Sequence, residues 1–279
     1  MFFSKLTIWL VLTICPFALG VTDPEIAFRS MDFDANNLMN SMAPAMGSSV
    51  NTLYTERDDI KDFSEDITFW CSNQQRQEQI KTMVNDSSLE SKVNLDKPFT
   101  FIVHGWTASG DSIWIKNATL SYWEFVDTNV CVVDWNRLSH YEYNIAALRN
   151  TKIVGKFIAE FIKGLVARKV DYEDITVVGH SLGGQIAGYV GAALDGKLGT
   201  IFGLDPAGPS FTHPILHGPS ERLDSSDAKF VQVIFTTKGL MGSSVDCGHQ
   251  NFFPNRGKFL QPGCETPEET FGVEMSKYL

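Results

Sequence analysis

Residues 175–193 read ITVVGHSLGGQIAGYVGAA, and this stretch decides the fold. Residues 175–178 form a short apolar run of mostly β-branched side chains, which is typical of a buried strand, and residues 185–193 form a small-residue helix that can pack closely on a sheet. The turn between them is a G-x-S-x-G pattern, in which side chains at Gly179 and Gly183 would collide. We expect this nucleophile elbow to present the Ser181 hydroxyl above the sheet and to place the next amides at a helix N-terminus, where they can bind an oxyanion.

Short apolar runs of the same kind lie on both sides of this stretch. The candidate strands are residues 67–70, 99–103, 130–133, 200–204 and 230–234, and residues 145–170 carry apolar side chains at helical spacing. Strands that alternate with helices predict an α/β fold with a mostly parallel central sheet and helices on both faces. Functional residues in such sheets gather at the carboxyl ends of strands, so we expect the chemistry to follow Val103, Val178 and Leu204.

Asp205 stands at one of these strand ends. A serine at an elbow needs a carboxylate and then a histidine later in the chain. Asp205 fits the carboxylate, although an aspartate before Pro206 can also simply cap a loop. Three histidines follow it: His213 and His217 lie only a few residues away, which leaves His249 as the candidate that this order nominates.

The composition limits the classes of function. The chain has 279 residues, of which 43% are hydrophobic and 20% charged, as in a folded globular protein with one large α/β domain or two small ones. Its formal net charge of −10 argues against a nucleic-acid binder, which needs a basic face. No later stretch is apolar enough to span a membrane, so we expect no transmembrane segment.

The N-terminal residues predict secretion. Residues 1–20 combine a single charge, Lys5, with an apolar run too short for the roughly 20 residues of a bilayer span and with a small-residue end, which is typical of a secretory signal peptide. Residues 21–65 are polar and without clear period, so we expect an N-terminal extension or propeptide before a domain over residues 66–279. Asn85 and Asn117 begin glycosylation sequons, although such triplets are also common by chance.

Secretion makes the cysteines candidates for disulfides. Cys15 leaves with the signal peptide, and four cysteines remain, which allow three pairings: Cys71, Cys131, Cys247 and Cys264. No two of them have C-x-x-C spacing, so we expect neither a zinc site nor another metal or cofactor.

Several segments carry a family resemblance when they are taken together. They are FIVHGW (101–106), VVDW (132–135), GHSLGGQIAGYVG (179–191), LDPAGPSF (204–211), RLDSSDAKFVQVI (222–234), GHQNFFPN (248–255) and QPGC (261–264). In this order they resemble the pancreatic-lipase-like family, which includes lipoprotein lipases, pancreatic lipases and the secreted phospholipases A1 of insects. The resemblance runs from about Ile67 to Cys264, which is most of the mature chain.

The resemblance implies an α/β-hydrolase fold and hydrolysis of lipid carboxylic esters, triacylglycerol or phospholipid, by a protein that contacts the lipid surface peripherally. It implies that Ser181 is the nucleophile and Asp205 the acid of the triad. It also implies that the backbone amides of Trp106 and Leu182 bind the oxyanion, while the Trp106 side chain can be a core aromatic. Neither the lipid class nor the oligomeric state follows from these motifs.

The sequence departs from the family at the third member of the triad. The family histidine follows the segment that matches QPGC, whereas here no histidine follows His249, which matches an additional histidine of the family. We therefore expect the C-terminal part of the fold to be missing. Three hypotheses follow: an active hydrolase that obtains a histidine elsewhere, a catalytically inactive homologue that binds lipid or protein, and an incomplete product of the gene for an ordinary enzyme.

Two smaller departures concern polar sites. Phe235 stands where the family usually carries a histidine, so a local polar interaction is lost. The family often binds calcium near the segment that matches Arg222, Asp224 and Asp227. Pro219 stands where an acidic residue is usual in the vertebrate enzymes, so solvated carboxylates are at least as good an interpretation.

The resemblance also bears on the disulfides. The family partner of Cys264 matches a position beyond Leu279, so Cys264 is expected to be free, bonded to another chain or bonded to Cys247. For the other pair we prefer Cys71 with Cys131, because both lie on or near strands of one sheet.

Overall fold

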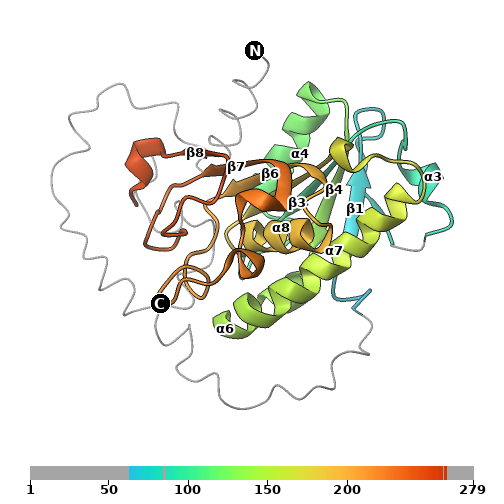
Figure 1. Ribbon diagram of the computed structural model, residues 1–279. Helices are drawn as coiled ribbons and strands as arrows, with labels where there is room; N and C mark the ends of the chain where they lie inside the picture. The colour runs from blue at the N-terminus through green and yellow to red at the C-terminus, as the bar shows by residue number, and fades with distance from the viewer. Residues whose placement is uncertain (1–62, 84–85, 260, 263–279) are drawn as a thin grey trace.

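The computed structural model of the chain describes residues 63–83, 86–259 and 261–262. Several expectations concern residues outside these ranges: the signal peptide at 1–20, the extension up to residue 62, the sequon at Asn85 and the pairing of Cys264. The described residues form an eight-stranded sheet with helices on both faces (Figure 1).

The sheet has the strand order β2-β1-β4-β3-β5-β6-β7-β8. Its strands are β1 (Thr68–Ser72), β2 (Ile80–Thr82), β3 (Phe99–Val103), β4 (Asn129–Asp134), β5 (Ile175–His180), β6 (Leu198–Leu204), β7 (Ala228–Ile234) and β8 (Gln250–Phe252). Strand β1 runs antiparallel to β2 and β4, whereas every pair from β4 to β8 is parallel. The predicted mostly parallel sheet is confirmed, and the fold is that of an α/β-hydrolase.

Helices follow most of the strands. They are α3 (Leu89–Lys92), α4 (Ile113–Phe125), α5 (Asn136–Ser139), α6 (Tyr143–Ile145), α7 (Thr151–Val166) and α8 (Leu182–Ala193), with a π-helical turn η3 (Ala146–Asn150) and the 3-10 turns η4 (Tyr172–Asp174), η5 (Pro219–Glu221), η6 (Ser225–Asp227) and η7 (Pro254–Gly257). The helix expected over residues 145–170 corresponds to α6, η3 and α7 in continuous succession. It ends at Val166, before the left-handed backbone of Lys169 (φ 71°).

Alternate strand residues enter two hydrophobic layers. Phe101 packs into the layer that α7 and α8 cover, and its neighbour Ile102 packs into the layer that α4 covers. The larger layer contains an aromatic cluster in which the Phe161 ring lies 4.3 Å from the Phe69 ring and 5.7 Å from the Phe101 ring, centroid to centroid. Because both faces are covered, the central strands from β3 to β7 consist mostly of apolar residues, as the sequence shows.

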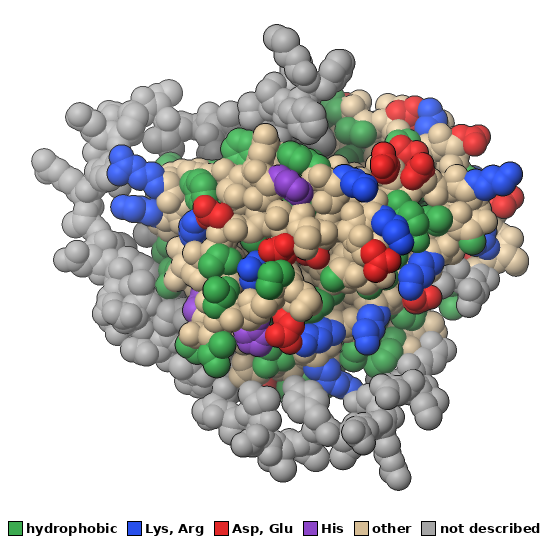
Figure 2. All heavy atoms as spheres, in the orientation of Figure 1, with side chains coloured by type: hydrophobic (Ala, Val, Ile, Leu, Met, Phe, Trp, Pro, Cys, Tyr) green, Lys and Arg blue, Asp and Glu red, His purple; other side chains and the backbone are tan. Residues whose placement is uncertain are grey.

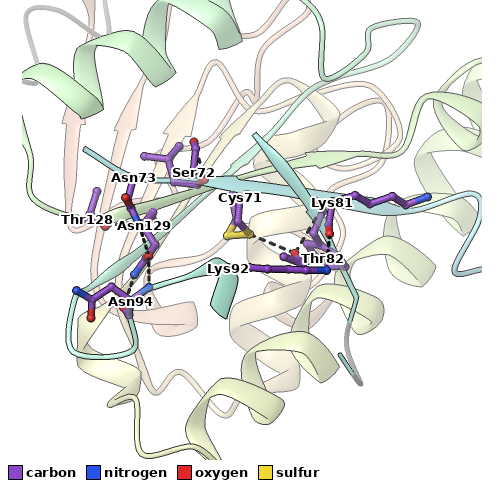
Figure 3. Close-up of a disulfide and its surroundings, with 12 residues drawn as sticks. Cys71, Ser72, Asn73, Lys81, Thr82, Lys92, Asn94, Thr128 and Asn129 are labelled. Carbon is purple, nitrogen blue, oxygen red and sulfur yellow. Dashed lines mark hydrogen bonds between the residues drawn. A yellow bond between two sulfur atoms is a disulfide. The ribbon is translucent and has the colours of Figure 1, made fainter. Parts of the chain in front are cut away.

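A disulfide joins Cys71 on β1 to Cys131 on β4, two residues that are direct partners across the antiparallel pair (Figure 3). The preferred pairing is therefore confirmed. Nearby, the buried Asn129 side chain donates to the carbonyl of Asn94 at 2.7 Å and accepts from its amide at 2.9 Å, which fixes the loop before β3 to the start of β4. Cys247 is a free, buried thiol, and burial raises its pKa to about 12.

Lys, Arg, Asp and Glu side chains are interspersed on the face drawn in Figure 2. Ion pairs of the protein include Lys163 with Glu160 at 2.8 Å along α7 and Lys152 with Glu221 at 3.6 Å. None of the helices in the described part of the chain has the length and apolar character needed to cross a membrane.

Candidate active site

Ser181 occupies the sharp turn between β5 and α8, as the sequence predicts. Its backbone has φ 56° and ψ −120°, a combination that a residue with a side chain rarely adopts and that marks stored strain. A Cβ atom on Gly179 would lie 2.0 Å from the carbonyl oxygen of Gly183, so the two glycines of the motif are in direct contact. The strained turn therefore depends on this pair of glycines.

The loop after β3 comes directly against the serine. A Cβ atom built on Gly105 would lie 2.9 Å from the Ser181 Cβ and 3.4 Å from its Oγ. Trp106, the next residue, is half-buried, and its indole N–H donates to the Tyr141 carbonyl at 2.9 Å. Leu182, the first residue of α8, is buried, and the amide of a first helical residue has no acceptor within its own helix. Both expected oxyanion residues thus lie next to Ser181.

Asp205 follows β6 and is held by a set of donors. Its Oδ1 accepts from the backbone amides of Thr236 at 3.0 Å and Thr237 at 3.1 Å, and its Oδ2 accepts from the Thr237 hydroxyl at 2.6 Å. The same turn is bonded to the elbow, because the Ser181 amide donates to the Leu204 carbonyl at 3.0 Å and the Ala207 amide donates to the Ser181 carbonyl at 3.1 Å. The carboxylate and the serine therefore belong to one hydrogen-bonded unit.

No histidine is bonded to that carboxylate in the part of the chain that the structure describes. All six histidines of the sequence fall within the described residues, and none of them is hydrogen-bonded to Asp205 there. His213 Nε2 donates to the Leu240 carbonyl at 2.9 Å, and His217 Nδ1 lies 3.5 Å from a Glu221 carboxylate oxygen. His180, beside Ser181, has a pKa below its usual value because the ring is desolvated, although the charge of Asp205 acts in the opposite direction.

His249, which the order of the triad nominates, serves another purpose. Its Nδ1 accepts from the Val231 amide at 3.0 Å, and its ring stacks on Phe230 at 6.1 Å. Val231 pairs with Ile201, three residues before the carboxyl end of β6. The structure therefore does not bring His249 to Asp205, in agreement with its assignment as an additional histidine.

The acidic segment near η6 is used for backbone capping. The Asp224 carboxylate accepts from the Ser226 amide at 3.0 Å, and the Asp227 carboxylate accepts from the Asp224 amide at 2.8 Å. Burial, reinforced by the nearby Asp224 charge, raises the pKa of Asp227 to about 8, although the Asp224 amide and Arg222 act in the opposite direction. Within the described ranges, no three acidic, histidine or cysteine side chains are grouped so as to hold a metal.

Phe235, which replaces a usual histidine of the family, is fully buried. Its ring stacks on Phe253 at 5.2 Å, and the Lys238 ammonium lies 4.7 Å from the Phe253 centroid and 5.2 Å from that of Phe235. Residue 235, which precedes the Asp205 donors Thr236 and Thr237, therefore takes part in aromatic packing.

Apolar side chains are exposed in the loops that leave the carboxyl end of the sheet. Ile215 and Leu216, which follow β6, are 68% and 56% exposed, and Tyr141, which follows β4, is 46% exposed. Ile113, at the start of α4 after β3, is 66% exposed. Two of these strands, β3 and β6, are the ones that Gly105 and Asp205 follow.

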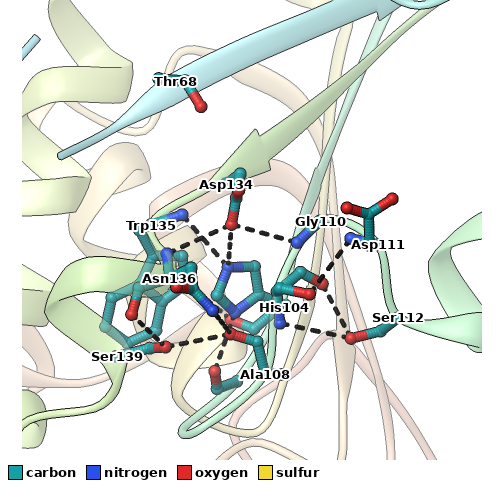
Figure 4. Close-up of polar contacts among 12 residues, drawn as sticks. Thr68, His104, Ala108, Gly110, Asp111, Ser112, Asp134, Trp135, Asn136 and Ser139 are labelled. Atoms are coloured by element: carbon teal, nitrogen blue, oxygen red, sulfur yellow. Dashed lines mark hydrogen bonds and ion pairs between the residues drawn. The ribbon is translucent and has the colours of Figure 1, made fainter. Parts of the chain in front are cut away.

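Two sets of residues at the site were not identified from the sequence. The donors Thr236 and Thr237 lie in the loop that follows β7, and only the fold brings them to Asp205. His104 and Asp134 form a part-buried contact (Figure 4), with His104 Nε2 3.2 Å from Asp134 Oδ1. The positions of these two residues at the ends of predicted strands were a usable signal, because neighbouring parallel strands bring their ends together.

Comparisons with known proteins agree on one family. A family model described as Lipase matches residues 35–276. The chain is 39% identical over 199 residues to lipase member H of Mus musculus, which covers 71% of this chain and 43% of that protein. It is 34% identical over 233 residues to pancreatic lipase-related protein 2 of Cavia porcellus, covering 80% and 52% respectively, and 39% identical over 197 residues to hepatic triacylglycerol lipase of Homo sapiens, covering 67% and 38%. The chain thus spans about two fifths to one half of the length of these relatives.

Proposed function

Because the chain belongs to the lipase family, we propose that it is a secreted hydrolase of lipid carboxylic esters with Ser181 as its nucleophile. The observation that carries this proposal is the strained elbow of Ser181 packed against Gly105, an arrangement typical of a serine placed for attack beside an oxyanion hole. The substrate class is triacylglycerol or phospholipid.

The chemistry follows from the geometry. The Ser181 oxygen attacks the ester carbonyl, and the backbone amides of Trp106 and Leu182 bind the oxyanion that develops. Loss of one such donor typically lowers the rate by about 10²- to 10³-fold. The alcohol then leaves, and water hydrolyses the acyl-enzyme. In this mechanism Asp205 would orient an imidazole that takes the serine proton and returns it to the leaving alcohol, and would stabilise the charged ring in between. None of the six histidines bonds to Asp205 in the described residues, so this mechanism requires a histidine from elsewhere.

The exposed apolar loops support contact with a lipid surface. Ile215, Leu216 and Tyr141 lie on loops that leave the same edge of the sheet as Ser181. An apolar rim around the entrance would let the protein dock on a lipid surface and pass an ester into the site.

Three sequence features support secretion: the signal-like residues 1–20, the sequons at Asn85 and Asn117, and the cysteines of the Cys71–Cys131 disulfide, a bond that persists in oxidising compartments.

A second candidate is a lipase-family protein that binds lipid or protein without turnover. The observation that favours it is that none of the six histidines of this sequence bonds to Asp205 in the described residues. Without a general base, most of the rate is lost while the pocket is kept.

Hydrolysis of p-nitrophenyl butyrate and of phosphatidylcholine vesicles by the purified chain separates the two candidates. With Ser181→Ala as the matched control, we expect hydrolysis by the wild type and only background by the variant, because the attacking oxygen is gone. A fluorophosphonate should label the wild type and not the variant. Equal rates for the two proteins would exclude the hydrolase. Binding of vesicles without turnover would support the second candidate.

A further inference from the structure

The His104 imidazole fixes the loop that carries Trp106, and Figure 4 shows the ring beside Asp134 and Trp135. His104 is the first residue after β3, and its side chain is completely buried. Its Nδ1 lies 2.9 Å from the carbonyl oxygen of Gly105. Since a carbonyl oxygen only accepts, Nδ1 carries a proton and donates it to Gly105.

Partners at the end of β4 fix the ring itself. His104 Nε2 lies 3.1 Å from the Trp135 amide and 3.2 Å from Asp134 Oδ1. Nε2 accepts from the Trp135 amide and lies beside the Asp134 carboxylate, so the end of β4 holds the ring in place. The Trp135 indole stacks on the imidazole at 5.3 Å and donates to the His104 carbonyl at 2.9 Å.

Asp134 also bonds to the far side of the loop. Its Oδ1 accepts from the amides of Gly110 at 3.1 Å and Asn136 at 3.2 Å. Burial alone would raise the pKa of Asp134, but the hydrogen bond and charge of His104 and these two amides hold it below its usual value. The anionic carboxylate therefore joins the residues before and after Trp106 to the end of β4.

Because a peptide group is planar, a bond that holds the Gly105 carbonyl also orients the N–H of the same peptide. The Gly105 carbonyl and the Trp106 amide belong to the same planar peptide, and in the trans form C=O and N–H point in opposite directions. When His104 holds the carbonyl, the direction of the Trp106 N–H is set as well. Gly105, the first residue of this peptide, lies against Ser181, since a Cβ atom built on it would be 3.4 Å from the serine Oγ.

We propose that His104 is a positioning residue for the oxyanion hole, which orients the Trp106 amide through the Gly105 carbonyl before substrate arrives. The inference rests on the proposed hydrolase function of the same site. His104 touches no substrate atom. It contributes by fixing the direction of the Trp106 N–H. The contacts of its ring with Asp134 and Trp135 prevent the ring from turning.

Two substitutions at residue 104 distinguish orientation from packing. His104→Phe keeps an aromatic ring against Trp135 but removes the Nδ1 donor, whereas His104→Asn gives up the ring but can place an amide N–H near the Nδ1 position. For a positioning role we expect His104→Phe to lower kcat by about 10- to 100-fold with KM within about twofold, since a small misplacement of a catalytic group costs up to about 10² in rate. His104→Asn should recover most of that loss. A packing role predicts the reverse order.

The matched control is His249→Phe. That histidine also bonds a backbone group through Nδ1, which there accepts from the Val231 amide, and it stacks on the ring of Phe230, away from Ser181. We expect it to change the melting temperature while leaving kcat within about twofold of wild type. A His104→Phe enzyme as active as this control would overturn the proposal.

A second readout does not need turnover. Amide hydrogen exchange over residues 105–110 should be about tenfold faster or more in His104→Phe than in His104→Asn, because only the former lacks the donor to Gly105. If the wild type hydrolyses no ester, the proposed function fails, and the order of these exchange rates still decides the role of His104. Equal or reversed exchange rates would contradict it.

Discussion

The Asp205 carboxylate uses both of its oxygens in binding the end of β7. Oδ1 accepts two backbone amides, while Oδ2 accepts the Thr237 hydroxyl at 2.6 Å, and that hydroxyl accepts in turn from the Gly242 amide at 2.9 Å. Each oxygen accepts about two bonds, so an imidazole that pairs with this carboxylate has its place on Oδ2. The Thr237 hydroxyl therefore determines the direction in which Oδ2 can accept a second hydrogen bond.

Thr237→Val is isosteric and removes that hydroxyl. We expect kcat to fall about tenfold with little change in KM, since the carboxylate can then turn, and the free energy of unfolding to fall by about 1–3 kcal/mol, since the buried Gly242 amide and the carboxylate each lose a partner. Ester hydrolysis and urea unfolding measure the two effects. Thr237→Ser keeps the hydroxyl and should restore both; a valine variant indistinguishable from the serine variant contradicts this role.

Among single residues, the sequence predicted those that are recognisable from their neighbours in the chain. Ser181 and Asp205 were identified because the glycines around one and the strand before the other leave a recognisable pattern. Thr237 was not identified, because it reaches Asp205 from the loop after β7, which is distant from Asp205 in the chain. Chain order alone would nominate His249, but its register beside Val231 places it away from the carboxyl end of the sheet, in agreement with its assignment as an additional histidine.

Helix α8 carries the serine on its N-terminus and lies unusually close to η6. A Cβ atom on Gly191 would lie 2.2 Å from the Asp227 carbonyl oxygen and 2.5 Å from the Asp227 Cβ. The first of these contacts is with backbone, which cannot give way by turning a side chain. The absence of a side chain at Gly191 therefore sets the distance between the helix and the turn that precedes β7.

Gly191→Ala should consequently destabilise the protein. Alanine is normally better than glycine inside a helix by about 1 kcal/mol, but here we expect a net loss of about 1–3 kcal/mol because the methyl group overlaps Asp227. Thermal unfolding measures the change. Gly218→Ala is the control, because no atom lies within 4 Å of a Cβ built at that residue, and its stability should match the wild type. A stabilised Gly191→Ala protein would show that the helix can move away from η6.

The elements that the sequence missed share a physical cause. Helix α4 buries Ile115 and Tyr122 yet exposes Ile113, Leu120 and Phe125, so its apolar residues follow no single face. Strands β2 and β8 have three residues each, which is too short for a period to be read. The buried strands from β3 to β7 were predicted because apolar side chains fill both of their faces.

For the molecule as a whole, the Cys71–Cys131 disulfide closes a loop with a sequence separation of 60 that contains β2, β3 and α4. Substituting both cysteines with serine should lower the free energy of unfolding by about 2–5 kcal/mol, because the unfolded chain regains the freedom of that loop. Urea unfolding measures the loss, and the wild type with and without reductant is the control. A midpoint that does not respond to reductant would contradict this contribution.

The raised pKa of Asp227 couples the folding of this protein to the binding of a proton. Its carboxyl has a pKa of about 8 in the folded chain, against an ordinary value of 3.8. Between these two values the folded protein holds a proton that the unfolded chain has released, so the free energy of unfolding falls as the pH rises through this window and levels off above it. Folding near pH 7 therefore takes up about one proton from the buffer at this residue, and the native protein is less negative by about one unit than its formal charge of −10.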